Sequence, residues 1–197
     1  NKFNQSLSFA KSKEEIAGLY ALMAIWNPGP ALEQIKRVID NKPKHEALPL
    51  LIMREVNKLE DWIYTPKLTN HKPSLYPMID EYLDRNEYEK IKEKNRIKHL
   101  KYLDEFLCYL DSLQNKIQPE LKDYLILARA HLNLMANRSS EALSLFAKIE
   151  KTANPSIQLQ KNMELALYNC FEKKITDNKV KQELAQTLLE LEKIARK

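Results

Sequence analysis

The sequence predicts an all-α protein of about eight helices, and three observations lead to this fold class. Apolar residues recur at the three- and four-residue spacing of amphipathic helices along the whole 197-residue chain, and no stretch shows the alternation of a β-strand. The chain contains only two glycines, and nine prolines punctuate the helical segments. Hydrophobic residues make up 44% and charged residues 30% of the sequence, a balance typical of a globular protein with a sizeable core.

Helix start and stop signals divide the chain into predicted helices that are joined mostly by short turns. Ser12 and Glu15 form a capping box, Pro30 and Pro119 suit first turns, and Asp177 caps the last helix. The predicted helices span residues 13–27, 30–42, 46–64, 80–116, 119–136, 139–151, 154–174 and 178 onward, with Ser139 or Ser140 capping the sixth and Asn154 preceding the seventh. Short connections of this kind favour antiparallel neighbouring helices.

We interpret residues 1–197 as a single all-helical, repeat-like domain. Its N-terminal hairpins occupy residues 13–64, and a long charged helical region occupies residues 80–116. The C-terminal hairpins occupy residues 119–197. A proline-rich segment, residues 65–79, lies between the N-terminal hairpins and the charged helical region. It shows no helical period and is predicted to form an irregular loop.

Two predicted helices carry pronounced apolar stripes. The stripe of the first helix consists of Ile16, Leu19, Leu22, Met23 and Trp26. The stripe of the last helix consists of Val180, Leu184, Leu188, Leu191 and Ala195. Terminal elements of a helical array need a polar outer face. If the array continues beyond this chain, part of the last stripe should therefore be exposed or covered by a second copy, which leaves a homodimer through terminal helices as an option.

Two stretches resemble the tetratricopeptide repeat, each with a lengthened turn. They are IAGLYALMAIWNPGPALEQIKRVIDNKP and LARAHLNLMANRSSEALSLFAKIEKTANP. The matching positions are the alanine of the second helix, an aromatic or large apolar position, a small apolar position and a closing proline, namely Ala31, Ile35, Val38 and Pro43 in the first and Ala142, Phe146, Ile149 and Pro155 in the second. A third stretch, REVNKLEDWIYTPKLT, is similar to part of large uncharacterised bacterial repeat proteins.

The resemblance implies a short right-handed solenoid of stacked helical hairpins. Such solenoids present a concave helical surface to a protein or peptide, so we hypothesise a non-enzymatic interaction scaffold. A helical bundle without repeats is the alternative fold. In both folds a small residue permits close approach of two helices and a large one fills the groove.

Several classes of chemistry find no motif in the sequence. The chain has no G-x-G-x-x-G or G-x-x-x-x-G-K-[ST], so we expect neither a Rossmann cofactor site nor a P-loop. Gly18 lies inside the first predicted helix, where we expect close packing against a neighbour to require it.

The four histidines lack metal-ligand spacing, and we expect His131 to pack against a neighbouring helix. We predict no catalytic residue, cofactor or metal, and we expect Cys108 and Cys170 to be buried thiols, although a disulfide between them stays open.

A basic stretch offers the alternative function, nucleic-acid binding. The stretch EYEKIKEKNRIKHLKY, residues 87–102, contains six lysine and arginine residues and three glutamates, and the sequence pI is near 9.0. The candidate patch consists of Lys92, Arg96, Lys98 and Lys101. Lysines at successive even positions are expected to spread around a helix and not to form one stripe, so a solvated helix is the competing interpretation.

Four aromatic residues bracket the proline-rich segment, namely Trp62, Tyr64, Tyr76 and Tyr82. Aromatic side chains supply rigid contact area at low entropic cost, so this group is a candidate partner-binding surface. The same residues are equally suited to closing one end of a solenoid. Which of the two applies stays open at this point.

The sequence leaves the compartment open. It contains no run of 18 apolar residues that would predict a membrane-spanning helix, and its first residues do not form a signal peptide. The chain begins at Asn1 without a methionine, which suggests a processed or trimmed product.

Overall fold

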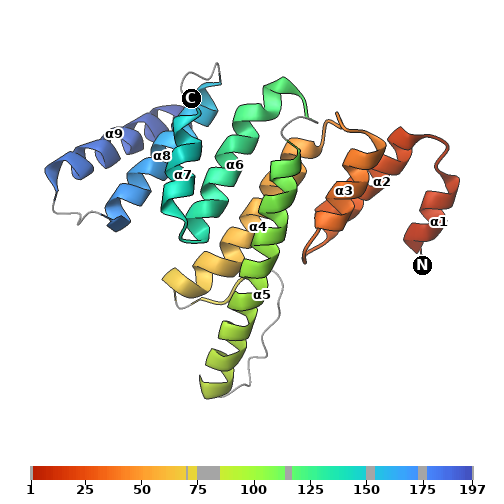
Figure 1. Cartoon of the computed structure of the whole chain (residues 1–197), viewed down its shortest axis with the longest axis horizontal. Coiled ribbons are helices and arrows are strands. Elements are labelled where there is room, and N and C mark those ends of the chain that lie inside the picture. The colour runs from red at the N-terminus through yellow and green to blue at the C-terminus, as the bar shows by residue number, and fades with distance from the viewer. Residues whose placement is uncertain are drawn as a thin grey trace. The chain divides into compact units, whose positions relative to one another are not determined.

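The computed structural model describes residues 2–69, 71–74, 85–113, 117–149, 154–172 and 177–196. Within these ranges the protein has nine α-helices, one short 3-10 helix and no strand, which confirms the predicted all-α class. The chain divides into two compact units, residues 1–122 and 123–197, which we call the N-terminal and C-terminal units. Figure 1 shows the helices of both units in chain order.

The helices have the following bounds. The N-terminal unit contains α1 (Lys2–Phe9), α2 (Lys13–Trp26), α3 (Leu32–Asn41), α4 (Leu48–Leu68), α5 (Arg85–Ser112) and the 3-10 helix η1 (Pro119–Leu121). The C-terminal unit contains α6 (Lys122–Met135), α7 (Ser139–Ala147), α8 (Pro155–Glu172) and α9 (Asn178–Ala195). Neither α1 nor η1 was predicted; Phe3 of α1 packs edge-on against Tyr20 of α2, with ring centroids 5.4 Å apart.

Caps predicted from the sequence start α2 and α9. The Ser12 hydroxyl accepts a 3.1 Å hydrogen bond from the Glu15 amide, while the Glu15 carboxylate accepts one of 2.6 Å from the Lys11 amide. The Asp177 carboxylate accepts a 2.9 Å hydrogen bond from the Lys179 amide. The predicted serine cap of α7 is wrong, because Arg138 precedes that helix without a side-chain cap and Ser139 is its first residue.

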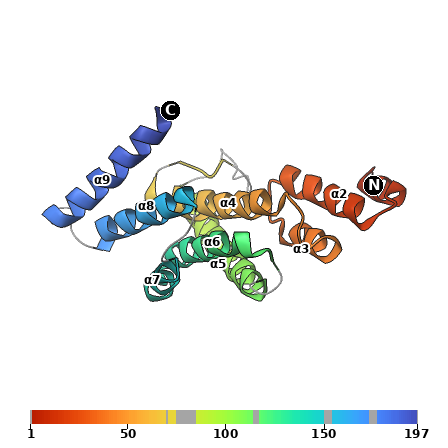
Figure 2. The ribbon, with the colours of Figure 1, turned by 90° about the horizontal axis from the view of Figure 1, so that it is seen from above.

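The buried face of α2 is an alanine face and not the predicted large apolar stripe. Ala17, Ala21 and Ala24 are at most 3% exposed, and they share one side of the helix. Figure 2 shows α3 running beside α2. Small side chains permit such close approach, and the larger residues of the predicted stripe are left for the other side. The expected packing requirement at Gly18 is also wrong, because a Cβ there would meet nothing within 4 Å.

The core of the N-terminal unit lies between α4 and α5. Leu59 and Trp62 of α4 are at most 1% exposed, and Leu103 and Phe106 of α5 are fully buried. The helix α4 runs to Leu68, so the predicted irregular segment 65–79 begins four residues too early.

Side-chain hydrogen bonds stabilise the end of α4. Pro66 lies inside the helix, and a proline there removes a backbone donor. The Asp61 carboxylate accepts hydrogen bonds of 2.9 Å from the Thr65 hydroxyl and of 2.8 Å from the Ser74 amide. The second of these bonds holds Ser74 against the helix, and residues 75–84 lie outside the described residues.

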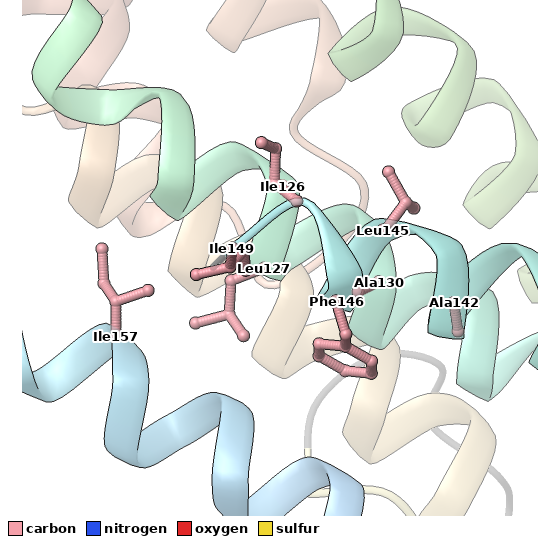
Figure 3. Close-up of a cluster of buried hydrophobic side chains, with 8 residues drawn as sticks. All are labelled: Ile126, Leu127, Ala130, Ala142, Leu145, Phe146, Ile149 and Ile157. Atoms are coloured by element: carbon pink, nitrogen blue, oxygen red, sulfur yellow. The ribbon is translucent and has the colours of Figure 1, made fainter. Parts of the chain in front are cut away.

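In the C-terminal unit, residues of α6, α7 and α8 form one hydrophobic cluster (Figure 3). Its members are Ile126, Leu127, Ala130, Ala142, Leu145, Phe146, Ile149 and Ile157. Against α8 packs α9, with Val180 and Thr187 buried and Leu184 and Leu191 half-buried. One member of the predicted stripe of α9, Leu188, is 54% exposed.

The expectation that both cysteines are buried thiols is wrong. Both are free, with Cys108 exposed and Cys170 half-buried. The exposure of Cys108 follows from its place on α5, on the side opposite to the core residues Phe106 and Leu110.

Candidate functional site

The most exposed large apolar side chain of α2 is Trp26, which is 82% exposed. Leu22, four residues earlier, is 55% exposed, and Met23 is 36% exposed. Helical geometry places these three side chains opposite the buried alanine face. We call Leu22, Met23 and Trp26 the outer α2 face.

The outer α2 face exists because the second half of α2 is apolar all round. A helix of that composition is ordinarily buried on both sides. Here the alanine face packs in the core of the N-terminal unit, whereas the outer face carries larger side chains into solvent. Apolar patches of this kind on a folded surface mark interaction sites more often than single scattered apolar residues do.

The turn that follows Trp26 is held in place by a buried lysine of α4. The Lys58 ammonium donates hydrogen bonds to the carbonyl oxygens of Gly29, at 2.6 Å, and Asn27, at 3.5 Å. Within the turn, the Asn27 side chain accepts from the Gly29 amide and donates to the Pro30 carbonyl, at 2.9 and 2.8 Å. The end of α2 is thereby fixed, and Trp26 with it.

A buried carboxylate fixes the start of α3 in the same way. Glu55 of α4 accepts a 3.0 Å hydrogen bond from the Ala31 amide and a further hydrogen bond from the Tyr102 hydroxyl of α5. That hydroxyl accepts a 3.1 Å hydrogen bond from the Leu32 amide. Ala31 provides no side-chain cap of its own. Carboxylate oxygens at a helix N-terminus satisfy otherwise unpaired amides and favour the helix dipole.

Glu55 and Lys58 form an ion pair with 2.5 Å between oxygen and nitrogen, and both side chains are 1% exposed. Burial lowers the pKa of Lys58, and the charge of Glu55 opposes this shift. Burial, followed by the charge of Glu55, raises the pKa of Tyr102. The pair therefore serves two helix ends at once: the ammonium binds carbonyls after α2, and the carboxylate binds an amide before α3.

A buried histidine lies next to this polar cluster. The His99 ring of α5 is 2% exposed and stacks on Trp62 with ring centroids 5.1 Å apart. Neither ring nitrogen makes a hydrogen bond of good geometry. Burial, and then the charge of Lys98, lower the pKa of His99 to about 4, with the nearby Trp62 backbone offsetting part of the shift. His99 is consequently neutral near pH 7.

The predicted aromatic surface is not brought together as one exposed patch. Trp62 is 1% exposed and belongs to the core, so it offers no contact area to a partner. Tyr64 is half-buried and lines an open groove of 340 Å³ along the last turns of α4. Tyr76 and Tyr82 lie outside the described residues.

The helix α5 separates the predicted basic patch into two sides. Lys92 and Arg96 lie beside two glutamates: Lys92 is 3.9 Å from Glu89, and Arg96 makes two 2.8 Å hydrogen bonds to Glu93. Lys98 and Lys101 lie on another side of the helix, together with Lys90 and Lys94. We call Lys90, Lys94, Lys98 and Lys101 the lysine row. The basic residues at successive even positions therefore lie on two sides of the helix, and residues four apart share a side.

In the C-terminal unit, a polar side-chain contact joins α6 and α8. His131 Nδ1 lies 2.7 Å from a Glu164 carboxylate oxygen, and the second oxygen accepts a 3.0 Å hydrogen bond from Gln160. His131 thus makes a polar contact where packing alone was expected. The last helix exposes Leu188, Leu189 and Ile194 by 51 to 59%.

Sequence reasoning missed the roles of Trp26, Glu55 and Lys58. One signal was present for the ion pair: Leu51, Glu55, Lys58 and Trp62 are spaced by four, three and four residues, which puts two charged residues on the buried side of α4. A second signal was the four- and three-residue spacing of Ala17, Ala21 and Ala24, which marks a side suited to close helix packing.

Three further observations concern metal binding, membrane spanning and similarity to known proteins. The histidine, cysteine and carboxylate side chains in the described part of the chain form no group of three that could hold a metal ion. None of the helices in these ranges has the length and apolar character needed to cross a membrane. No protein-family model, curated protein or solved structure matches the chain.

Proposed function

We propose that the protein is a non-enzymatic interaction scaffold made of tetratricopeptide-like helical hairpins, and that it binds an amphipathic helix of a partner protein on the outer α2 face. The observation that carries the proposal is the 82% exposure of Trp26 on a rigidly held helix end. Tryptophan is enriched among the residues that dominate binding energies. The buried state of the repeat-like positions Ala31, Ile35, Ala142 and Phe146, each at most 1% exposed, supports the hairpin part of the proposal.

The size of the face favours a helix of a partner over a second copy of this chain. Trp26, Leu22 and Met23 together offer about 300–400 Å² of apolar surface. That is the size of functional patches on monomers, and it is well below the roughly 800 Å² that each partner buries in a stable interface. A helix presents apolar side chains at spacings of three and four residues, which suits a face that spans Leu22 to Trp26, about one and a half turns.

Selection from a library of helical peptides tests the proposal. The full chain is the bait, and the Trp26→Ala variant is used for counter-selection. We expect enriched peptides with apolar residues at positions i, i+3 or i+4, and i+7. Truncation of a dominant tryptophan costs about 2 kcal/mol or more, so binding to the variant should be at least about 30-fold weaker.

Leu143→Ala serves as the matched control, because Leu143 is an exposed leucine of another helix, at 39%. This variant should bind the enriched peptides as the wild type does. Truncation of an exposed residue should leave stability within about 0.5 kcal/mol, which thermal unfolding of both variants checks. Peptides that bind Trp26→Ala equally well would overturn the proposal. So would sedimentation showing a wild-type dimer that Trp26→Ala converts to a monomer, because the occupant would then be a second copy.

A further inference from the structure

The lysine row is a regular line of positive charge on α5. Its four side chains, Lys90, Lys94, Lys98 and Lys101, are all exposed. Successive members lie three or four residues apart, so the row is about 17 Å long with a lysine every 5–6 Å. No acidic residue lies between its ends on that side of the helix; Glu87 precedes the row and Glu105 follows it.

The acidic residues within this stretch are engaged elsewhere. Glu89 lies beside Lys92, and Glu93 accepts both hydrogen bonds of Arg96. The hydrogen bond from Arg96, and then its charge, hold the pKa of Glu93 below its ordinary value. These four residues lie on another side of α5, where Glu89 pairs with Lys92 and Glu93 pairs with Arg96.

The row is also accessible. No described side chain of α5 before His99 is buried. Figure 1 shows the N-terminal half of α5 extending past the end of α4. An extended polymer can therefore lie along this half of the helix without meeting the body of the N-terminal unit.

The geometry of the row favours one class of partner. A helix that lies on an anionic membrane needs a broad apolar side, whereas the other side of this segment carries Lys92, Arg96 and two glutamates. On the row's own side, Ile97 is the exposed apolar residue, at 59%. A row of lysines that recur every three or four residues along one side of a helix suits a linear polyanion, whose phosphates also repeat regularly.

We propose that the lysine row binds the phosphate backbone of a nucleic acid without regard to base sequence. The row contains lysines only, which act on phosphate as point charges and not as the bidentate forks that arginine offers to guanine. This activity is separate from the protein-binding face on α2. Four neutralised phosphates would give a slope of log affinity against log salt of about −3.6 on a duplex.

Fluorescence anisotropy of the full chain with a labelled DNA duplex of about 20 base pairs, between 50 and 200 mM salt, tests the proposal. Affinity of the wild type should fall about 150-fold over this range. For Lys90→Gln/Lys94→Gln, which leaves two lysines of the row, the fall should be only about 12-fold. A duplex of scrambled base sequence should bind equally well.

The matched control is Lys92→Gln/Arg96→Gln, which removes the same two charges from the same helical turns on the other side. It frees the carboxylates of Glu89 and Glu93 and should lower the affinity at every salt concentration, but it should keep the wild-type slope of log affinity against log salt, because the lysine row still contacts the same phosphates. Circular dichroism should show both variants as helical as the wild type. Absence of binding at 50 mM salt would overturn the proposal. Equal effects of the two double variants would also overturn it, because net charge alone would then explain binding. Binding to phosphatidylserine vesicles or polyglutamate with no binding to the duplex would assign the row to a membrane or an acidic protein instead.

Discussion

The buried imidazole of His99 should lower the free energy of unfolding of the N-terminal unit in acid, and the substitution His99→Phe should remove this effect. His99 is 2% exposed and stacked on Trp62, and burial lowers its pKa from 6.5 to about 4. The unfolded chain therefore binds a proton that the folded chain does not bind between these pH values. Stability from this residue is fully present above about pH 6.5 and is lost as the pH falls through about 4.

The size of the effect follows from the two pKa values. Their difference corresponds to about 3 kcal/mol in total, of which about 2 kcal/mol should be lost between pH 7.5 and pH 5.0. Phenylalanine keeps an aromatic ring on Trp62 but has no proton to bind. Between these two pH values the free energy of unfolding of the wild type should therefore fall by about 2 kcal/mol more than that of His99→Phe. The other ionisable groups contribute equally to both proteins and cancel in this difference.

Urea unfolding followed by circular dichroism at the two pH values measures this difference. His71→Gln, which removes an exposed histidine, is the control and should follow the wild type. If His99→Phe and the wild type lose the same free energy within about 0.5 kcal/mol, the histidine is not held neutral by burial, and the reasoning fails.

Three further substitutions probe stability, each read from urea denaturation. Gly18→Ala should stabilise the protein by about 0.5–1 kcal/mol, because the added methyl meets nothing within 4 Å and alanine favours a helix; a loss would show a contact that the glycine permits. Lys58→Met should cost about 3–5 kcal/mol, because it leaves the Glu55 carboxylate buried without its cation, whereas Lys36→Met in an exposed ion pair should cost under about 1 kcal/mol. Comparable costs at the two lysines would contradict a buried role for the first. Asp177→Ala should cost about 1 kcal/mol through the lost cap of α9, and an unchanged midpoint would refute it.

Local signals in the sequence predicted most of the helix boundaries because the interactions behind them are local. Ser12 and Asp177 cap helices through amides only two or three residues away, and Asn154 accepts from the Ser156 amide at 3.0 Å. The spacing of apolar residues alone was enough for the all-α class. Pro66 misled the prediction of the end of α4, because the helix continues through this proline to Leu68, where Asp61 accepts hydrogen bonds from Thr65 and from Ser74 beyond the helix.

The candidate site could not be predicted in the same way, because it depends on which side of α2 meets its neighbours. Leu22 and Trp26 are more hydrophobic than Ala21 and Ala24, so a count of apolar residues assigns the wrong side to the core. Packing decides otherwise, since alanines allow close approach to α3. Lysines are almost always solvated, so burial of Lys58 depends on its distant partners in the turn after α2.

The buried ion pair that closes the α2–α3 turn also bears on how the chain folds during synthesis. The amides of Ala31 and Leu32 find their partners on Glu55 and Tyr102, which lie 24 and 70 residues later in the sequence. At ribosomal rates, 70 residues take about 4 to 14 s to be added. The Ala31 amide and the Gly29 carbonyl remain bound to water until Glu55 and Lys58 have been added, and the Leu32 amide does so until Tyr102 has been added. The first hairpin to leave the ribosome therefore becomes rigid only after α5 has been made, and residues 1–47 alone should not form a stable structure.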